Sequence, residues 1–296
     1  MALPALTDER AALAAELRAR QIESAKKLIK LPGTILFESG DHVRFYWSAL
    51  LGIPFAVSKY RREVLRLIST VAFGSGAIAL VGGTVVVVAF LTAFAGIELG
   101  LQGYSQLSNI GVEALSGFIS AYINTRLAAP ALAGIALTAT VGAGFTAQLG
   151  AMRVSEEIDA LEVMSIRSIP YLVSTRIVAG LVSIVPLYAV ALLASYAATR
   201  LIVTIGFHQS SGAYQHYFNT FLIPSDIVLS FINVMCMSVV IMAVCCYYGY
   251  HASGGPAGVG KAVGSAVRLS LVAILFADLL ISLALYGNAH TLNISG

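Results

Sequence analysis

Long stretches without any charged residue constrain this chain more than any other feature of its sequence. Residues 67–97 carry no Asp, Glu, Lys or Arg over 31 positions, and residues 127–152, 177–199 and 227–250 carry none either. A membrane-spanning helix needs about 20 mostly apolar residues. Only 11% of the 296 residues are charged, whereas soluble domains carry about 25%. We therefore predict an all-α integral membrane protein with five spans, the fifth over residues 264–286.

The basic residues are distributed unevenly along the chain. Of the 18 Lys and Arg residues, 11 lie in residues 1–66. Three more flank the segment between the second and third spans, and two precede the fifth span. In a five-span bundle these residues share one side, and cytoplasmic segments are the ones enriched in Lys and Arg. The pattern predicts a cytoplasmic N-terminus, an outside C-terminus and a multi-pass protein of the plasma membrane. A net charge of +3 is too small to indicate nucleic-acid binding.

We divide the chain into three parts. Residues 1–60 are predicted to form cytoplasmic and interfacial helices, because aromatic and basic residues intermingle there as in helices that lie in the membrane interface. Residues 61–290 would form the membrane domain, followed by a tail at 291–296. As a straight helix the first uncharged run would be about 46 Å long, against a hydrocarbon core of about 30 Å, so it must tilt, bend or enter in two parts. The more polar residues 98–126 predict the first outer loop.

A cluster of four carboxylates separates the second and third spans. The cluster consists of Glu156, Glu157, Asp159 and Glu162. One charged side chain at the centre of a membrane costs about 2.5–3.5 kcal/mol on insertion scales. The cluster must therefore lie in water or against a protein. We interpret it as the surface through which a soluble partner drives this membrane protein.

The spacing of these residues predicts a short amphipathic helix at about 153–165. The apolar stripe consists of Val154, Ile158 and Leu161, and the acidic stripe of Glu156, Asp159 and Glu162. Both spacings place their members on one face of a helix. We expect Ser155 to cap the N-terminus of this helix. A solvated loop helix without a partner is the alternative.

Polar residues near or inside the spans are further candidates. Asp278 lies in the fifth span, and an intramembrane carboxylate is a functional candidate by default. It could be a protonated, hydrogen-bonded group, a proton relay or a structural tie to another span, and we favour the tie. Gln102 and Tyr104, near the outer end of the first span, are candidates for a lipid pathway. Interfacial anchoring is the alternative for Tyr104.

We expect no nucleotide, metal or other cofactor site in this chain. Gly255-x4-Gly260-Lys261 fits the opening of a phosphate-binding loop. However, Ala262 replaces the Ser or Thr that would hold Mg²⁺, and a membrane helix precedes the loop in place of a strand. The three cysteines share one apolar span and show no metal-ligand spacing.

A series of motifs spans residues 60–290. In order they are Gln102-Gly103-Tyr104, Gly111, Glu113, Arg126 to Pro130, Thr146 to Arg153, Glu156 to Met164, Gly249-Tyr250, Gly258-Val259-Gly260 and Asp278. The series resembles the MlaE/YrbE permeases, the membrane subunits of lipid-trafficking ABC transporters. The resemblance implies an N-terminal interfacial helix, five spans and a cytoplasmic coupling helix that docks on a separate ATPase, which would bind ATP and Mg²⁺. It assigns ATPase coupling to Glu156, Glu157, Asp159, Leu161 and Glu162, and makes Arg126 an intramembrane polar candidate beside Asp278.

Three departures from the family pattern suggest a subtype. The family's Arg-Glu-Leu-Gly-Pro reads Arg126-Leu127-Ala128-Ala129-Pro130 here, Thr140 replaces a common Arg, and Gln148 replaces a Glu. These changes resemble B-type YrbE proteins of actinobacterial Mce systems, which pair with an A-type paralogue. Residues 217–226 and 293–296 look most like the sterol-importing branch.

The resemblance thus implies a permease subunit of an Mce-type importer for a sterol such as cholesterol. Its implied partners are an MceG-like ATPase, an A-type YrbE permease, Mce substrate-binding or shuttle proteins, and membrane lipids. A fatty acid or phospholipid is the alternative substrate. A proton-coupled carrier using Asp278 and a membrane scaffold of a lipid-shuttling assembly are the alternative functions.

Overall fold

The computed structural model describes residues 40–73 and 83–286. The chain divides into two compact units, Met1–Ser48 and Ala49–Gly296. In the first unit residues 40–48 are helical, and everything below concerns the second. Residues 1–39 of the expected cytoplasmic and interfacial part, residues 74–82 of the first uncharged run and the tail at 291–296 lie outside the described residues.

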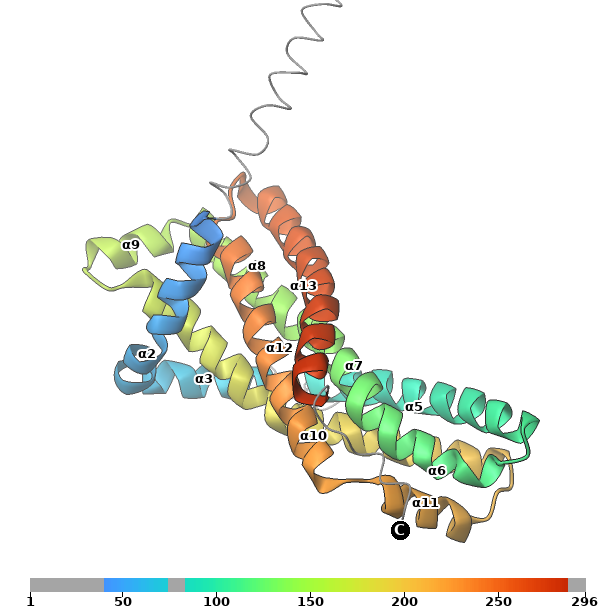
Figure 1. Cartoon of the computed structure of the whole chain (residues 1–296). Helices are drawn as coiled ribbons and strands as arrows, with labels where there is room; N and C mark the ends of the chain where they lie inside the picture. The colour runs from blue at the N-terminus through green and yellow to red at the C-terminus, as the bar shows by residue number, and fades with distance from the viewer. Residues whose placement is uncertain (1–39, 74–82, 287–296) are drawn as a thin grey trace, which may run out of the picture. The chain divides into compact units, whose positions relative to one another are not determined.

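Five helical segments of the second unit are long and apolar enough to cross a membrane (Figure 1). They are Thr84–Asn109 (α5), Glu113–Val154, Ile169–Gly206, Pro224–Tyr250 (α12) and Gly255–Tyr286 (α13). The described residues contain no β-strand. The prediction of an all-α protein with five spans is confirmed.

The second and third spans are built from several helical pieces. The second comprises η1 (Glu113–Leu115), α6 (Ser116–Ile119), η2 (Ser120–Ala128), α7 (Ala129–Leu137), η3 (Thr138–Gly142) and α8 (Ala143–Val154). The third comprises η4 (Ile169–Ser174), α10 (Thr175–Leu201) and η5 (Ile202–Gly206). The segments η2, η3, η4 and η5 are π-helical. Such wide turns are rare in helices and frequent at functional sites.

The predicted outer loop at 98–126 is wrong. The first span continues as helix α5 to Asn109, and the connection to the second span is only residues 110–112, with Gly111 in the left-handed region at φ +72°. The polar side chains that suggested a loop lie on the helix surface, where the amide of Gln102 donates to the carboxylate of Glu98 one turn earlier. The polar residues mark the exposed outer end of the first span, where helix α5 continues to Asn109.

The described residues of the first uncharged run belong to two separate helices, in agreement with the expected entry in two parts. Residues Arg61–Phe73 form a separate amphipathic helix, α3, after the short helix α2 (Ile53–Lys59). Its Val64, Leu67 and Val71 are buried, whereas Leu65 and Arg66 are exposed. One face of α3 packs on α10, so this part of the uncharged run begins on the bundle surface.

Helix α10 lies at the centre of the bundle, in contact with α3, α5, α7 and α12 (Figure 1). Its closest approach to α5 is at Gly96, where an added Cβ would collide with the backbone carbonyl of Ser195. Beside this point the Thr199 hydroxyl donates to the Gly96 carbonyl (2.8 Å) and accepts from the Asn124 amide (3.0 Å). Small residues and interhelical hydrogen bonds are what hold membrane helices together.

We predict that Gly96→Ala destabilises the bundle by about 1–3 kcal/mol, the usual cost of overpacking. The added methyl group has no free space between α5 and α10. Gly144→Ala on α8 is the matched control, since no atom lies within 4 Å of its Cβ position. Thermal unfolding in detergent measures both. Equal stability of the two variants would contradict the close contact.

Candidate functional site

The acidic cluster forms a short helix, α9 (Glu157–Val163), between α8 and η4. Its N-cap is Glu156, in the left-handed region at φ +60°. The prediction that Ser155 caps this helix is wrong. Its hydroxyl instead donates back to the carbonyl of Ala151 (3.0 Å), in the last turn of α8. The chain turns between α8 and α9 at this left-handed residue.

The other end of α9 is equally well defined. Ser165 is left-handed at φ +59°. Its N–H donates to the Glu162 carbonyl (2.9 Å), and the Ile166 N–H donates to the Leu161 carbonyl (3.0 Å). This pair of bonds is a Schellman motif, which normally uses glycine at the left-handed position. Non-glycine residues in this conformation cost about 1–3 kcal/mol and persist only where the surroundings impose them. Two such residues therefore delimit α9.

The acidic helix has one buried residue and a largely exposed surface. Ile158 is fully buried, Leu161 is half-buried and Val154 is exposed, so Ile158 provides most of the apolar anchor. The four carboxylate residues are all exposed. Asp159 forms an ion pair with Arg153 at the end of α8. Because both side chains are exposed, the pair contributes only about 0–1 kcal/mol.

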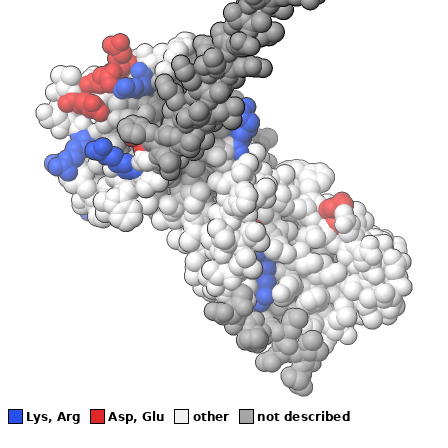
Figure 2. Space-filling view, turned by 45° about the horizontal axis from the view of Figure 1, so that its top comes forward, with Lys and Arg blue, Asp and Glu red and all other residues white. Residues whose placement is uncertain are grey.

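Two large apolar residues at the end of α9 were missing from the predicted site. Val163 is 86% exposed and Met164 is 61% exposed, and we call this pair the apolar tip. Charged side chains gather at this end of the molecule, while the rest of the visible face is almost uncharged (Figure 2). Exposed apolar residues among charges are candidates for contact with a protein partner. In the sequence, the position of this apolar pair directly after Glu162 could have indicated it as part of the candidate site.

A three-residue hydrogen-bonded cluster ties α9 to the third and fourth spans. The Ser168 hydroxyl donates to Oε1 of Glu162 (2.7 Å) and lies 2.9 Å from the Tyr250 hydroxyl. Tyr250, the last residue of α12, also donates to Oε1 of Glu162 (3.2 Å). We call these three residues the Glu162 clasp. Sequence reasoning missed Ser168 and Tyr250 as site residues, because 82 residues separate them along the chain.

Arg126 lies in a buried ion pair with Asp226. Its Nε and Nη2 both reach Oδ2 of that carboxylate, at 2.9 and 2.7 Å. Its guanidinium lies between the rings of Tyr122 and Tyr286, with centroids at 4.3 and 4.6 Å. The contact joins the second span to the start of α12 and the end of α13. Each charge is paired, and the cation also contacts two aromatic faces.

Asp278 faces a residue of the neighbouring span. The amide of Asn233 on α12 donates to its carboxylate (2.7 Å), and Asn233 is fully buried. The contact matches the geometry of a tie between α13 and α12. Its role stays a prediction.

Arg176 is one of the three basic residues that were counted as flanking the segment between the second and third spans, and the structure places it elsewhere. It lies inside the third span, is only 5% exposed and donates to the Leu172 carbonyl (2.8 Å). Its guanidinium lies 5.5 Å from the centre of the Phe145 ring.

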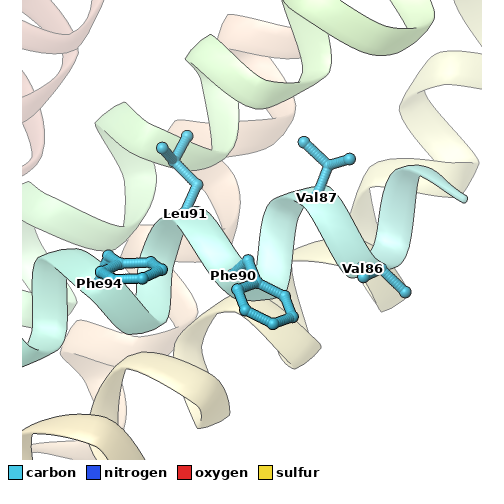
Figure 3. A pocket seen from close by; sticks show the side chains of 5 residues that line it. All are labelled: Val86, Val87, Phe90, Leu91 and Phe94. Carbon is cyan, nitrogen blue, oxygen red and sulfur yellow. The ribbon is translucent and has the colours of Figure 1, made fainter. Parts of the chain in front are cut away.

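The structure separates the two predicted lipid-pathway residues. Gln102 is exposed on α5, whereas Tyr104 is half-buried and stacks on Phe207 with 4.2 Å between ring centroids. This stacking joins the first span to the end of the third, and the role of Tyr104 stays a prediction. Neither residue lines the apolar hollow of about 390 Å³ found nearer the start of α5. Figure 3 shows the lining of this α5 hollow, which consists of Val86, Val87, Phe90, Leu91 and Phe94.

Comparison with known proteins identifies the family. The profile described as Permease MlaE matches residues 73–284. The chain belongs to the MlaE permease family. The acidic helix, the ion pair of Arg126 and the α5 hollow all lie within the matched region of the permease.

Relatives of the permease come from bacteria and plastids. A "Probable ABC transporter permease protein" of Rickettsia bellii is 32% identical over 196 residues, which cover 66% of this chain and 76% of the relative. The Synechocystis protein slr1045, also a probable ABC transporter permease, is 27% identical over 69% of this chain and 78% of its own length. The Arabidopsis thaliana chloroplastic protein TRIGALACTOSYLDIACYLGLYCEROL 1 is 29% identical over 64% of this chain and 55% of its own length.

These findings make the permease a membrane subunit of a transporter rather than an enzyme in itself. Together with the five spans, they support a multi-pass protein of the plasma membrane.

We predict that Asp226→Ala destabilises the permease by about 3–5 kcal/mol, because it leaves the Arg126 charge buried without its carboxylate. Replacing both partners with leucine should cost less than the single change. Glu63→Ala, which breaks an ion pair with the exposed Arg66, is the control and should cost about 0–1 kcal/mol. Thermal unfolding of the purified variants measures the difference. A double variant less stable than Asp226→Ala would contradict the role of the ion pair.

Proposed function

We propose that the chain is the B-type YrbE permease subunit of an Mce-type ABC importer and moves a sterol such as cholesterol across the plasma membrane. A separate ATPase would power transport by docking on α9, with ATP and Mg²⁺ bound in that partner. The observation that carries the proposal is the acidic helix itself. It is short, rigidly bounded and exposed, and it is hydrogen-bonded to two spans.

The surface of α9 suits a protein partner. Its exposed carboxylates would face basic residues of the ATPase, and opposite charges raise the rate and specificity of association. The apolar tip, Val163 and Met164, would fill an apolar pocket of the partner, since buried apolar groups contribute most of the binding energy at an interface. Membership of an ABC permease family supports an ATPase as this partner.

A lipid substrate is supported by two independent observations. The α5 hollow is shallow and wholly apolar and lies on the exposed side of one helix, so a hydrocarbon chain could lie along it without stripping water from a polar group. The name of the Arabidopsis relative contains that of a glycolipid, trigalactosyldiacylglycerol. The choice of a sterol depends on the likeness of residues 217–226, most of which form the outer helix α11 (Ser211–Phe221) and the start of α12.

Pairing with an A-type paralogue is supported by the departures at Ala128, Thr140 and Gln148. Thr140 is half-buried and donates to the Ala136 carbonyl (2.7 Å) in its own span, and Gln148 is exposed. A second, unequal permease subunit could supply the charged groups that this one lacks at these positions. Mce shuttle proteins would deliver the lipid from outside.

We predict that reversing Glu156, Glu157 and Asp159 together to lysine detaches the ATPase and stops lipid uptake. Electrostatic repulsion would replace attraction between α9 and the ATPase. The fold should survive, because all three side chains are exposed. Co-purification of the ATPase from native membranes, followed by proteomics, measures this. Glu162 is left unchanged because its carboxylate also accepts the hydrogen bonds of Ser168 and Tyr250 in the Glu162 clasp.

Glu98→Lys is the control, since Glu98 is exposed on α5 and belongs to the first span. It should retain the ATPase. Unchanged co-purification in the triple variant would sink the coupling proposal. A scaffold without ATP-driven transport would also keep its uptake in that variant.

We expect lipid mass spectrometry of the same purified complex to find sterol enriched over the membrane from which it was extracted. Phe90→Ser with Phe94→Ser should lower this enrichment, because two polar groups would enter the apolar hollow. The matched control is Phe276→Ser on α13, equally exposed at 64% but outside the hollow. Enrichment of a fatty acid or phospholipid instead would reject the sterol and retain the transporter.

A further inference from the structure

We propose that the Glu162 clasp is the element that transmits movement of α9 to the third and fourth spans, with Ser168 and Tyr250 as its positioning residues. The inference rests on the proposed function, in which an ATPase moves α9. It adds two residues outside the predicted coupling surface and says how a push on that surface reaches the membrane.

The geometry of the clasp concentrates the connection on one atom. Both hydroxyls reach the same carboxylate oxygen, Oε1 of Glu162, and lie within hydrogen-bond distance of each other. Hydrogen bonds to a charged acceptor are about twice as strong as neutral ones. Ser168 is buried and Tyr250 is half-buried, whereas the carboxylate of Glu162 that they share also faces water.

The backbone on both sides of α9 is short and fixed in shape. Left-handed residues Glu156 and Ser165 define its two turns, and only residues 164–168 link it to η4. A shift of α9 therefore pulls directly on Ser168. The π-helical segment η4 begins at the next residue, and an irregular turn of this kind is a place where a helix can change register.

The contact with Tyr250 gives the movement a second route, through space. Tyr250 is 88 residues from Glu162 along the chain. Just before it, Gly249 packs so closely on α8 that a Cβ would lie 2.9 Å from the Thr146 carbonyl oxygen. The Thr146 hydroxyl also donates to the Cys245 carbonyl (2.9 Å). The end of α12 and helix α8 are thus held together, so a displacement at Tyr250 moves both.

The experiment uses the full transporter complex in proteoliposomes, with labelled cholesterol as the probe and labelled oleate and phosphatidylglycerol beside it. The quantity measured is lipid transferred per ATP hydrolysed. Ser168→Ala and Tyr250→Phe should each lower this ratio by about tenfold, the lower end of what one hydrogen bond to a charged group can contribute. ATPase co-purification and the KM for ATP should stay unchanged, which a general loss of structure would not allow.

Two further variants separate transmission from packing. Ser168→Thr keeps the hydroxyl and should restore the wild-type ratio. The double variant Ser168→Ala with Tyr250→Phe should fall less than the product of the two single effects, because both hydroxyls serve one oxygen. Ser108→Ala is the control, since it removes an exposed hydroxyl from the last turn of α5, far from α9 (Figure 1).

Each outcome decides a separate question. A wild-type ratio in Ser168→Ala and Tyr250→Phe, with the ATPase bound, overturns the clasp and leaves the proposed function standing. Wild-type protein that binds no ATPase, or that moves none of the three lipids, overturns the proposed function and the clasp with it. If either single variant yields no complex, Glu162→Gln decides, since it keeps an acceptor oxygen but removes the charge. An unchanged ratio in that variant overturns the clasp.

Discussion

The hydrocarbon core of a membrane contains no water that could hydrogen-bond to a polar group, and this constraint shapes the whole permease. Charges inside the bundle need a partner, either an opposite charge or a hydrogen-bonding group such as the carbonyl that Arg176 reaches, and charges without one must lie outside it. Arg126 and Asp226 satisfy the first condition, with two tyrosine rings enclosing the guanidinium. The exposed carboxylates of α9 satisfy the second. One physical rule thus produces both the tie that joins three spans and the surface available to a partner.

Polar contacts and small residues divide the work of holding the spans together. Between α5 and α10 the backbones approach at Gly96, and the Thr199 hydroxyl bonds across the gap. Between α12 and α13 the amide of Asn233 meets the carboxylate of Asp278. Because lipid chains are as apolar as leucine, burial of leucine alone gives helices little reason to associate in a membrane. Close packing and interhelical hydrogen bonds provide that reason.

The acidic helix combines exposure with rigidity. A free loop could present the same carboxylates, but it would absorb a push by bending. Here Ile158 is buried, left-handed residues shape both turns, and Glu162 bonds to the two spans. An exposed surface held in this way can receive a partner and can also transmit force from it. The proposed coupling depends on both properties.

The sequence alone determined the class, the five spans, the position of the acidic helix and the family resemblance. Each of these depends on the length of uncharged runs, the order of motifs or the local periodicity, which are properties of neighbours along the chain. The sequence did not place the ends of the helices correctly. Polar residues such as Gln102 can lie on the surface of a helix as well as in a loop. The hydroxyl of Ser155 donates backward to α8 and does not cap α9. Only the tertiary structure brought Asp226 to Arg126, 100 residues away, and Tyr250 to Glu162. Such partners meet because of how the helices pack, and no single segment carries that information.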